Sequence, residues 1–311
     1  MNSPLPPASL NQSFTTLHAL EAGHLTLPRH LFISGASPTD RTTVPSLSFL
    51  ITHPSHGRLV FDLGIRNPIS EYSTPIQAHI VSRQPVTTTP DVTLSLASLG
   101  ITPDEIDTVV LSHVHWDHIG RPSAFPRAQF LVGAGSLALL EHGLPGGGSH
   151  SNFERGLLPR ERTVELTVAG EAAGWKMIAG FWMQDLFDDG SVFVVDAPGH
   201  LMGHVNLLVR TREGWWYLGG DAAHDRGILT GENEIGTWTV EGGGCGCIHQ
   251  DKEMAEETLG KIRGLLELCD VNVLLAHDVG WYMENRGKMV WPLAGSGKVK
   301  TGKMERVCTI L

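Results

Sequence analysis

Three histidines and one aspartate fall within six residues of the stretch LSHVHWDHIG (111–120), directly after the mostly apolar run IDTVV. His113 and His115 are two residues apart, and side chains at that spacing on extended chain point to the same side. Asp117 and His118 follow as the chain turns towards a glycine. Imidazole nitrogens and carboxylate oxygens are ligands of zinc and similar divalent ions. The spacing can therefore serve two ions, one through the first two histidines and the other through Asp117 and His118.

Further ligands are expected downstream, at the ends of other short apolar strands. The stretch FVVDAPGHLMGH supplies His200 after a strand and a Pro-Gly turn, and WWYLGGDAAH supplies Asp221. The stretch VNVLLAHDVG supplies His277 after another buried-looking strand. Each of the three residues lies where a rigid strand would present it to a site.

The elements that carry these residues are predicted to be hairpins and helices. LSFLITHPSHGRLVFDLG (47–64) and HVNLLVRTREGWWYLGGD (204–221) each read as two apolar strands joined by a turn, and each ends in an aspartate beside glycine. Helices are predicted within 87–100, 133–143 and 251–269; the last has apolar residues at alternating spacings of four and three. Strands mixed with helices, with antiparallel hairpins dominating, predict a layered α/β sandwich.

The composition is that of a water-soluble globular protein. The 311 residues carry a formal net charge of −10, without runs of Lys or Arg, which disfavours a nucleic-acid partner. No apolar run reaches the length of about 18 residues that a spanning helix needs, and the N-terminus has no basic and apolar regions of a signal peptide. Four cysteines are too few for a disulfide framework, so a cytoplasmic location is the expectation.

The motif HVHWDH, with a following Gly-His, a strand-end aspartate and a late histidine in the same order, resembles the metallo-β-lactamase superfamily from about Leu47 to about His277. The resemblance implies an αββα sandwich with metals at one edge of the sheets. The first metal would be held by His113, His115 and His200. The second metal would be held by Asp117, His118 and His277. Asp221 would bridge both metals, and Asp62 would support the ligands by hydrogen bonds, although an ordinary turn cap is an equally good interpretation of Asp62.

A hydrolytic reaction follows from such a site. Two zinc ions sharing one water lower its pKa and create a bridging hydroxide that attacks a carbonyl carbon, with Asp117 orienting it. Iron or manganese would accept the same ligands. A histidine at position 115 favours hydrolysis, because oxygen-reducing di-iron relatives carry glutamate there; an iron-dependent oxidoreductase is thus the less favoured alternative.

The substrate is predicted to be a small, largely apolar molecule. The motif flanks SHVHWDHIG and DAPGHLMGH look most like the lactonase-like branch, which includes N-acyl homoserine lactonases, so a lactone is expected. The tyrosine that those lactonases place near the metals has no clear match. A lactam, a cyclic carbamate or an acyl thioester suits the same chemistry. Candidate substrate-binding residues are Trp116, Trp281 and Tyr282, which neighbour ligands, and Trp182 and Met183, which can instead be core.

No linker divides the chain, so residues 1–311 are predicted to form a single hydrolase domain. The segment 222–250 is long for a connection and is a candidate lid. Its CGCIH run, with Cys245 and Cys247, has too few ligands for a closed zinc site and is interpreted as a loop. The last four residues, CTIL, fit a prenylation signal at Cys308, with an accidental tetrapeptide as the favoured interpretation.

Overall fold

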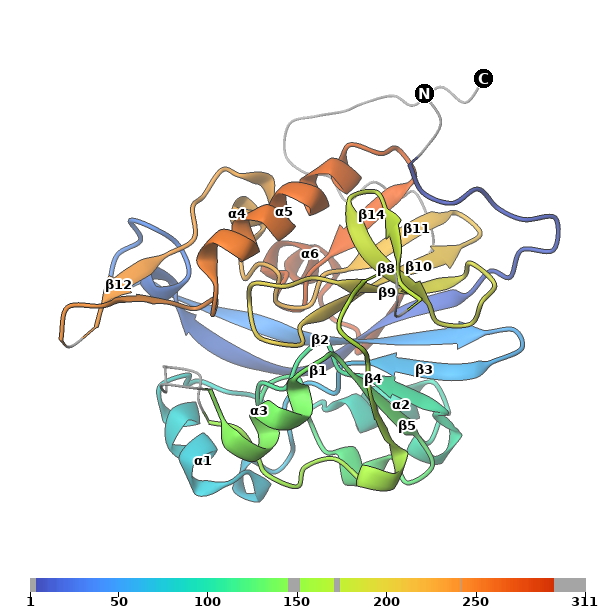
Figure 1. The fold of residues 1–311 in the computed structure, drawn as a ribbon. Helices are drawn as coiled ribbons and strands as arrows, with labels where there is room; N and C mark the ends of the chain where they lie inside the picture. The colour runs from blue at the N-terminus through green and yellow to red at the C-terminus, as the bar shows by residue number, and fades with distance from the viewer. Residues whose placement is uncertain (1–3, 145–151, 171–173, 241, 294–311) are drawn as a thin grey trace.

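The computed structural model describes residues 4–144, 152–170, 174–240 and 242–293, and shows two sheets stacked face to face with helices on both outer sides (Figure 1). Cys308 lies outside the described residues. The chain therefore has the α/β architecture, a four-layer αββα sandwich, that the sequence predicts.

Within the described ranges the first sheet has seven strands and the second has six. In spatial order the first sheet contains β15 (Val290–Pro292), β1 (Thr16–Pro28), β2 (Arg41–His53), β3 (Gly57–Phe61), β4 (Thr108–Val110), β5 (Gln129–Val132) and β6 (Thr163–Glu165). The second contains β14 (Val271–Leu274), β11 (Gly214–Leu218), β10 (Val205–Thr211), β9 (Val192–Asp196), β8 (Phe181–Asp185) and β7 (Lys176–Ile178).

The helices form the two outer layers. Those beside the first sheet are α1 (Thr74–Val81), α2 (Val92–Ser98) and α3 (Ser136–His142). On the side of the second sheet lie α4 (Arg226–Thr230) and α5 (Lys252–Leu266), whereas α6 (Val279–Asn285) follows β14 and contacts β2 of the first sheet. One-turn 3-10 helices lie at Arg29–Leu31, Ile69–Glu71, Pro103–Glu105, Pro122–Ala124 and Arg160–Arg162.

The central strands are buried on both faces, as a four-layer sandwich requires. Phe49, Leu50 and Ile51 of β2 are each at most 1% exposed. Successive side chains of a strand point to opposite faces, and accordingly Phe49 and Ile51 pack in one apolar cluster while Leu50 packs in the other. Because both faces of these strands are buried, their sequences are apolar throughout and do not alternate between apolar and polar residues.

Both predicted hairpins are confirmed, and so are the predicted helical stretches. β2 pairs antiparallel with β3, and β10 pairs antiparallel with β11. The sheets are more mixed than the sequence suggests, because β3, β4, β5 and β6 run parallel and β11 is parallel to β14. Helices α2 and α3 lie in the connections between parallel strands of the first sheet, and α5 lies in the β11–β14 connection; parallel strands need such crossovers.

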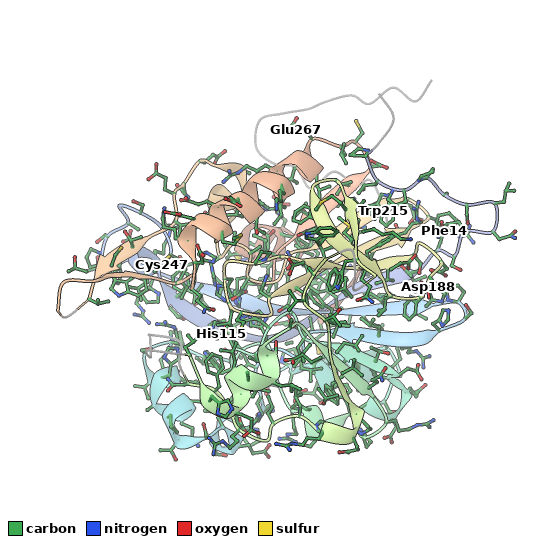
Figure 2. The ribbon with its side chains drawn as sticks, in the orientation of Figure 1. Phe14, His115, Asp188, Trp215, Cys247 and Glu267 are labelled. Atoms are coloured by element: carbon green, nitrogen blue, oxygen red, sulfur yellow. The ribbon has the colours of Figure 1, made fainter. Side chains whose placement is uncertain are left out.

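One predicted loop is wrong. Cys245–Cys247 form β13, which pairs antiparallel with β12 (Thr237–Thr239) in a separate two-stranded sheet. The glycines around β13 suggested irregular chain, but Trp238 lies against Gly246, whose lack of a side chain leaves room for the indole ring. This hairpin extends from one side of the molecule, and Figure 2 shows Cys247 on it.

Among the described residues no helix has the length and apolar character needed to cross a membrane.

Candidate metal centre

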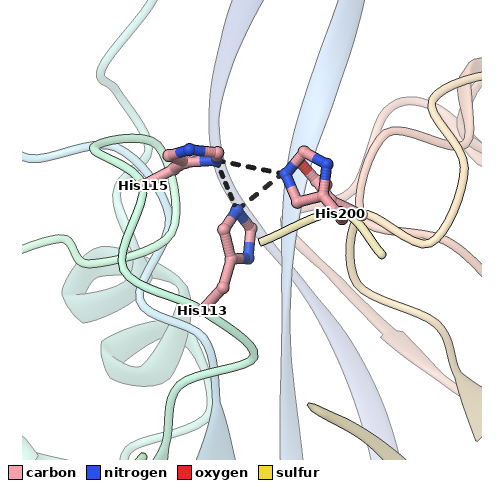
Figure 3. A group of neighbouring side chains, drawn as sticks. His113, His115 and His200 are labelled. Carbon is pink, nitrogen blue, oxygen red and sulfur yellow. Dashed lines mark hydrogen bonds and ion pairs between the residues drawn. The ribbon is translucent and has the colours of Figure 1, made fainter. Parts of the chain in front are cut away.

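Three histidines from two loops meet at one edge of the sandwich. His115 Nδ1 lies 2.8 Å from His113 Nε2 and 3.1 Å from His200 Nε2, and Figure 3 shows the three rings facing one another. All three residues are buried. His113 follows β4, whereas His200 follows β9 of the other sheet, so the fold joins residues 87 positions apart in the sequence at one edge of the sandwich.

Asp221 connects this group to a second one. Its Oδ2 lies 3.5 Å from His200 Nε2 and 3.7 Å from His113 Nε2. Its Oδ1 lies 3.2 Å from the Nε2 atoms of both His118 and His277. The two oxygens of one carboxylate therefore face two separate sets of nitrogen atoms.

Asp117 completes the second group. Its Oδ2 lies 3.5 Å from His277 Nε2, and its backbone carbonyl accepts a hydrogen bond of 2.6 Å from the Ser46 hydroxyl on β2. Ligand atoms of Asp117, His118 and His277 all lie within 4.8 Å of one another. The same holds for the set of His113, His115, His200 and Asp221.

The outer nitrogens of these rings are already engaged. His277 Nδ1 donates to the Pro45 carbonyl at 2.7 Å, and His118 Nδ1 donates to Asp62 Oδ2 at 2.9 Å. Each of these bonds holds a proton on Nδ1, so Nε2, the atom directed into the cluster, supplies the lone pair when the ring is neutral. Such outer hydrogen bonds set the tautomer of metal-binding histidines.

Asp62 is placed for this supporting role at the end of β3. Its carboxylate accepts bonds of 2.7 Å from both the backbone nitrogen and the hydroxyl of Ser112, besides the bond from His118. The Ser112 hydroxyl, having donated to Asp62, accepts from His113 Nδ1 at 2.9 Å. Asp62 thus links the strand end after β3 to the HVHWDH loop, and it has a φ of 59°, a left-handed conformation that is uncommon outside glycine.

The loop that carries His200 is tied to the start of α5. The backbone nitrogen of Gln250 donates to the His200 carbonyl, and that of Asp251 donates to the Gly199 carbonyl, both at 2.9 Å. Gly199 has a φ of 124°, and an added Cβ would lie 2.3 Å from the backbone nitrogen of Ala255 in α5. Glycine is therefore required beside the predicted ligand.

Three further histidines surround Asp221 and His200, and the sequence analysis did not identify them as site residues. His204 Nε2 accepts from the Asp221 backbone nitrogen at 3.2 Å, and His224 Nε2 lies 3.0 Å from Asp221 Oδ2. His249 Nδ1 lies 3.3 Å from His200 Nδ1. His204 and His224 are close in sequence to predicted ligands, and His249 is close to the glycine-rich run. Such proximity is too weak a pattern to identify a site residue.

Burial and mutual charge determine how these groups hold protons. Burial lowers the pKa of His113 and His200 well below the ordinary value and that of His115 to about 4, so all three are neutral at pH 7. Burial would raise the pKa of Asp221, but the charges of His118 and His277 outweigh it and hold that pKa well below its usual range. Neutral imidazole and ionised carboxylate are the forms that bind metals.

This donor set fits divalent metal ions. A buried carboxylate is costly to keep without compensating positive charge. Divalent cations held by the surrounding nitrogens would supply more of that charge than protons do. Nitrogen and oxygen donors of this kind suit zinc, iron and manganese.

A cavity opens beside these residues. Its walls are formed by Leu25, Leu27, Phe32, His79, Arg83, His115, Trp116, Asp117, His200, Asp221, His224, Ile248 and His277. Of the predicted substrate-binding residues it contains Trp116. The sequence analysis missed the wall that β1 and the end of α1 contribute, because these segments precede the motif by many residues and carry no ligand pattern.

The structure does not bring the other four predicted substrate-binding residues to this cavity. Met183 and Trp281 are buried in the apolar core at 1% and 5% exposure. Trp182 and Tyr282 pack against the cluster between the sheets, and the Tyr282 hydroxyl donates to Glu21 at 3.0 Å. Strand β8 and helix α6 use these side chains for packing, so we do not carry them into the functional proposal.

Comparison with known proteins agrees with this geometry. Residues 41–267 match the family model described as "Metallo-beta-lactamase superfamily". The chain belongs to the metallo-β-lactamase superfamily. Its buried His and Asp groups are of the kind that can hold divalent metal ions.

Relatives of this superfamily member differ in their named activities. The chain is 35% identical over 202 residues to the metallo-hydrolase mfmC of Annulohypoxylon moriforme, covering 61% of this chain and 51% of that protein. It is 29% identical to cytochrome P450 monooxygenase mpaDE' of Penicillium brevicompactum, covering 76% and 30%. It is 31% identical to gamma-lactamase FDB1 of Fusarium pseudograminearum, covering 58% and 46%. The chain thus spans about half the length of these curated relatives or less.

A solved structure shows the same fold. A quorum-quenching N-acyl homoserine lactone lactonase superposes with a TM-score of 0.62 at 18% identity, covering 87% of this chain and 95% of that one.

Metal binding should reverse how stability depends on pH. Without metal, burial opposes protonation of His277, but Asp221 and Asp117 outweigh it and raise its pKa to about 10. A raised pKa stabilises the fold below the unfolded value of about 6.5, and this contribution is lost as pH rises through 10. We expect the Tm of metal-free protein to fall between pH 7 and 10. With zinc, Tm should be higher and should fall on acidification, because protons compete for the ligands. Equal pH profiles with and without zinc, measured by calorimetry, would contradict this.

Proposed function

We propose that the chain binds two divalent metal ions, zinc in the first instance, and hydrolyses a small molecule with a lactone or a related activated carbonyl. The observation that carries this proposal is the position of Asp221, whose two oxygens face two separate groups of ligands. A carboxylate in this position can bridge two metal ions. His113, His115 and His200 would hold one ion, and Asp117, His118 and His277 the other.

When bound, two such ions lower the pKa of a shared water to near neutrality and neutralise negative charge that develops on the substrate. The residues of the chain hold this arrangement. Asp117 lines the cavity, and its carboxylate can accept a hydrogen bond from the attacking water and fix its direction. Asp62 fixes the tautomer of His118, and Pro45 fixes that of His277.

The cavity favours a small and partly apolar substrate. Leu25, Leu27 and Phe32 form one wall, and Trp116 and Ile248 are further apolar members. His224 and Ile248 come from the segment 222–250, which supports its interpretation as a lid within a single domain. We place the enzyme in the cytoplasm and expect no nucleic-acid partner.

A lactam or a cyclic carbamate is the second candidate. Relatives named gamma-lactamase, FDB1 and MBL2, are 31% and 34% identical to this chain, compared with 28% for N-acyl homoserine lactonase AttM. An acyl thioester remains the third candidate on the chemistry alone.

A substrate panel tests the choice. We expect zinc-loaded protein to hydrolyse aliphatic or aromatic lactones with a higher kcat/KM than a γ-lactam, a cyclic carbamate, a β-lactam or an acyl thioester. Turnover followed by pH-stat or absorbance gives the ranking. If the γ-lactam has the highest kcat/KM, the lactam replaces the lactone as the proposed substrate. If a phosphodiester alone reacts, the proposal of carbonyl hydrolysis is overturned.

A further inference from the structure

Arg83 is a buried cation in the wall of the cavity beside the metal ligands. The residue is 6% exposed and lines the same cavity as Asp117 and His200. Its Nη1 donates a hydrogen bond of 3.3 Å to the Ser82 hydroxyl. Within the described residues no carboxylate forms an ion pair with its guanidinium, which has five N–H donors.

The backbone holds Arg83 firmly in this place. Its nitrogen donates to the Ile80 carbonyl at the end of α1, and its carbonyl accepts from the Thr26 nitrogen of β1, both at 2.9 Å. Leu25 and Leu27 flank Thr26 and, two residues apart, point into the cavity on the same side of the strand. The arginine is therefore fixed next to the apolar wall rather than on a freely moving loop.

Such a cation is expensive to keep without an anion. Burial lowers the pKa of Arg83 because it disfavours the charged form, and the charge of Asp117 offsets this in part. Once Asp117 ligates a divalent cation its negative charge is shared with that cation, and the compensation for Arg83 weakens. The loaded site then has an excess of positive charge next to an apolar wall, and a buried charge of this kind calls for a partner.

We propose that Arg83 determines specificity by binding a carboxylate that the substrate carries away from its scissile bond. Arginine is suited to this, since its planar fork binds a carboxylate through two parallel hydrogen bonds. The inference rests on the proposed function and narrows its substrate class to lactones or lactams that bear a carboxylate. The apolar wall would receive the ring, and Arg83 would set its orientation.

Paired substrates test this on the zinc-loaded full-length chain. The pairs are phthalide with 5-carboxyphthalide, and γ-butyrolactone with its γ-carboxylate. We expect the wild type to prefer the carboxylated member. Arg83→Gln should raise KM for that member at least ~10-fold and leave kcat/KM of the neutral member within about 3-fold. Arg83→Lys should recover part of the loss, because it restores the charge without the fork.

Arg41→Gln is the matched control. Arg41 is exposed and donates to the carbonyls of Ser82 and Gln84, so its removal takes away one positive charge and a contact of the same segment without altering the cavity wall. This variant should keep the wild-type preference. If Arg83→Gln slows both members of a pair equally, or if the wild type shows no preference, Arg83 has a structural role and the proposal is overturned.

Binding of a carboxylate ligand tests the role of Arg83 independently of whether the proposed lactonase activity is correct. If the wild type hydrolyses no lactone, calorimetric titration with benzoate and with benzyl alcohol still decides the role of Arg83. Benzoate should bind the wild type and Arg41→Gln with similar affinity and bind Arg83→Gln at least ~10-fold more weakly. Equal benzoate affinity in all three proteins would overturn the proposal, whatever the enzyme hydrolyses.

Discussion

Replacement of Asp117 by alanine is expected to reduce kcat/KM for the hydrolysed substrate by about 10³-fold or more. The variant loses a carboxylate that lies 3.5 Å from His277 Nε2 and lines the cavity. Both the affinity for the second metal and the direction of the attacking water depend on this group in our account. Steady-state kinetics with excess zinc measure the loss.

Controls separate these two contributions. Asp117→Asn keeps the shape of the side chain but removes its charge, and Asp104→Ala removes an exposed carboxylate remote from the cavity and should behave as wild type. Elemental analysis of each variant accompanies the kinetics. An Asp117→Ala protein that holds the same metal and is as active as wild type would show that the role assigned to Asp117 is wrong.

Removal of the Asp62 carboxylate should have the largest effect on stability. Asp62→Ala leaves the Ser112 nitrogen, the Ser112 hydroxyl and His118 Nδ1 without their acceptor in a site that is 1% exposed or less. We expect the free energy of unfolding to fall by about 3 kcal/mol. Zinc affinity should fall about 10- to 100-fold, because the supporting bond to a ligand is lost.

Two further variants identify the cause. The left-handed φ of 59° at Asp62 suits asparagine and glycine better than alanine. Asp62→Gly therefore removes the carboxylate without adding backbone strain, and Asp62→Asn keeps one acceptor oxygen. We expect stability to decrease from wild type through Asn and Gly to Ala in denaturant unfolding. If the Asp62→Gly protein is as stable as the wild type, Asp62 serves only as a turn residue and its proposed supporting role is wrong.

The sequence was most informative where one local pattern determines geometry. The HVHWDH motif follows a buried strand, so its side chains project from one strand end, and the structure places them within 4.8 Å of their predicted partners. Asp221 and His277 were found in the same way, since each lies just after a short apolar strand. The hairpins 47–64 and 204–221 were recognisable because two apolar runs flank a polar turn.

Residues that depend on long-range packing were not predictable. Arg83 and Phe32 line the cavity because β1, the end of α1 and the HVHWDH loop converge there. No local sequence pattern predicts this convergence. His249 reaches His200 across 49 residues through the placement of the β12–β13 hairpin. Conversely, Trp281 follows a predicted ligand closely in sequence, yet α6 turns it into the core.

The metal content of the purified chain decides whether Asp221 joins two metal ions. Inductively coupled plasma mass spectrometry on zinc-loaded, desalted protein should find two metal ions per wild-type chain. Asp221→Ala, which removes the carboxylate that faces both groups, should retain at most one. A wild-type chain that holds two ions and loses occupancy in Asp221→Ala agrees with the account. A wild-type chain that holds a single ion or none, or an Asp221→Ala chain that still holds two, would contradict it.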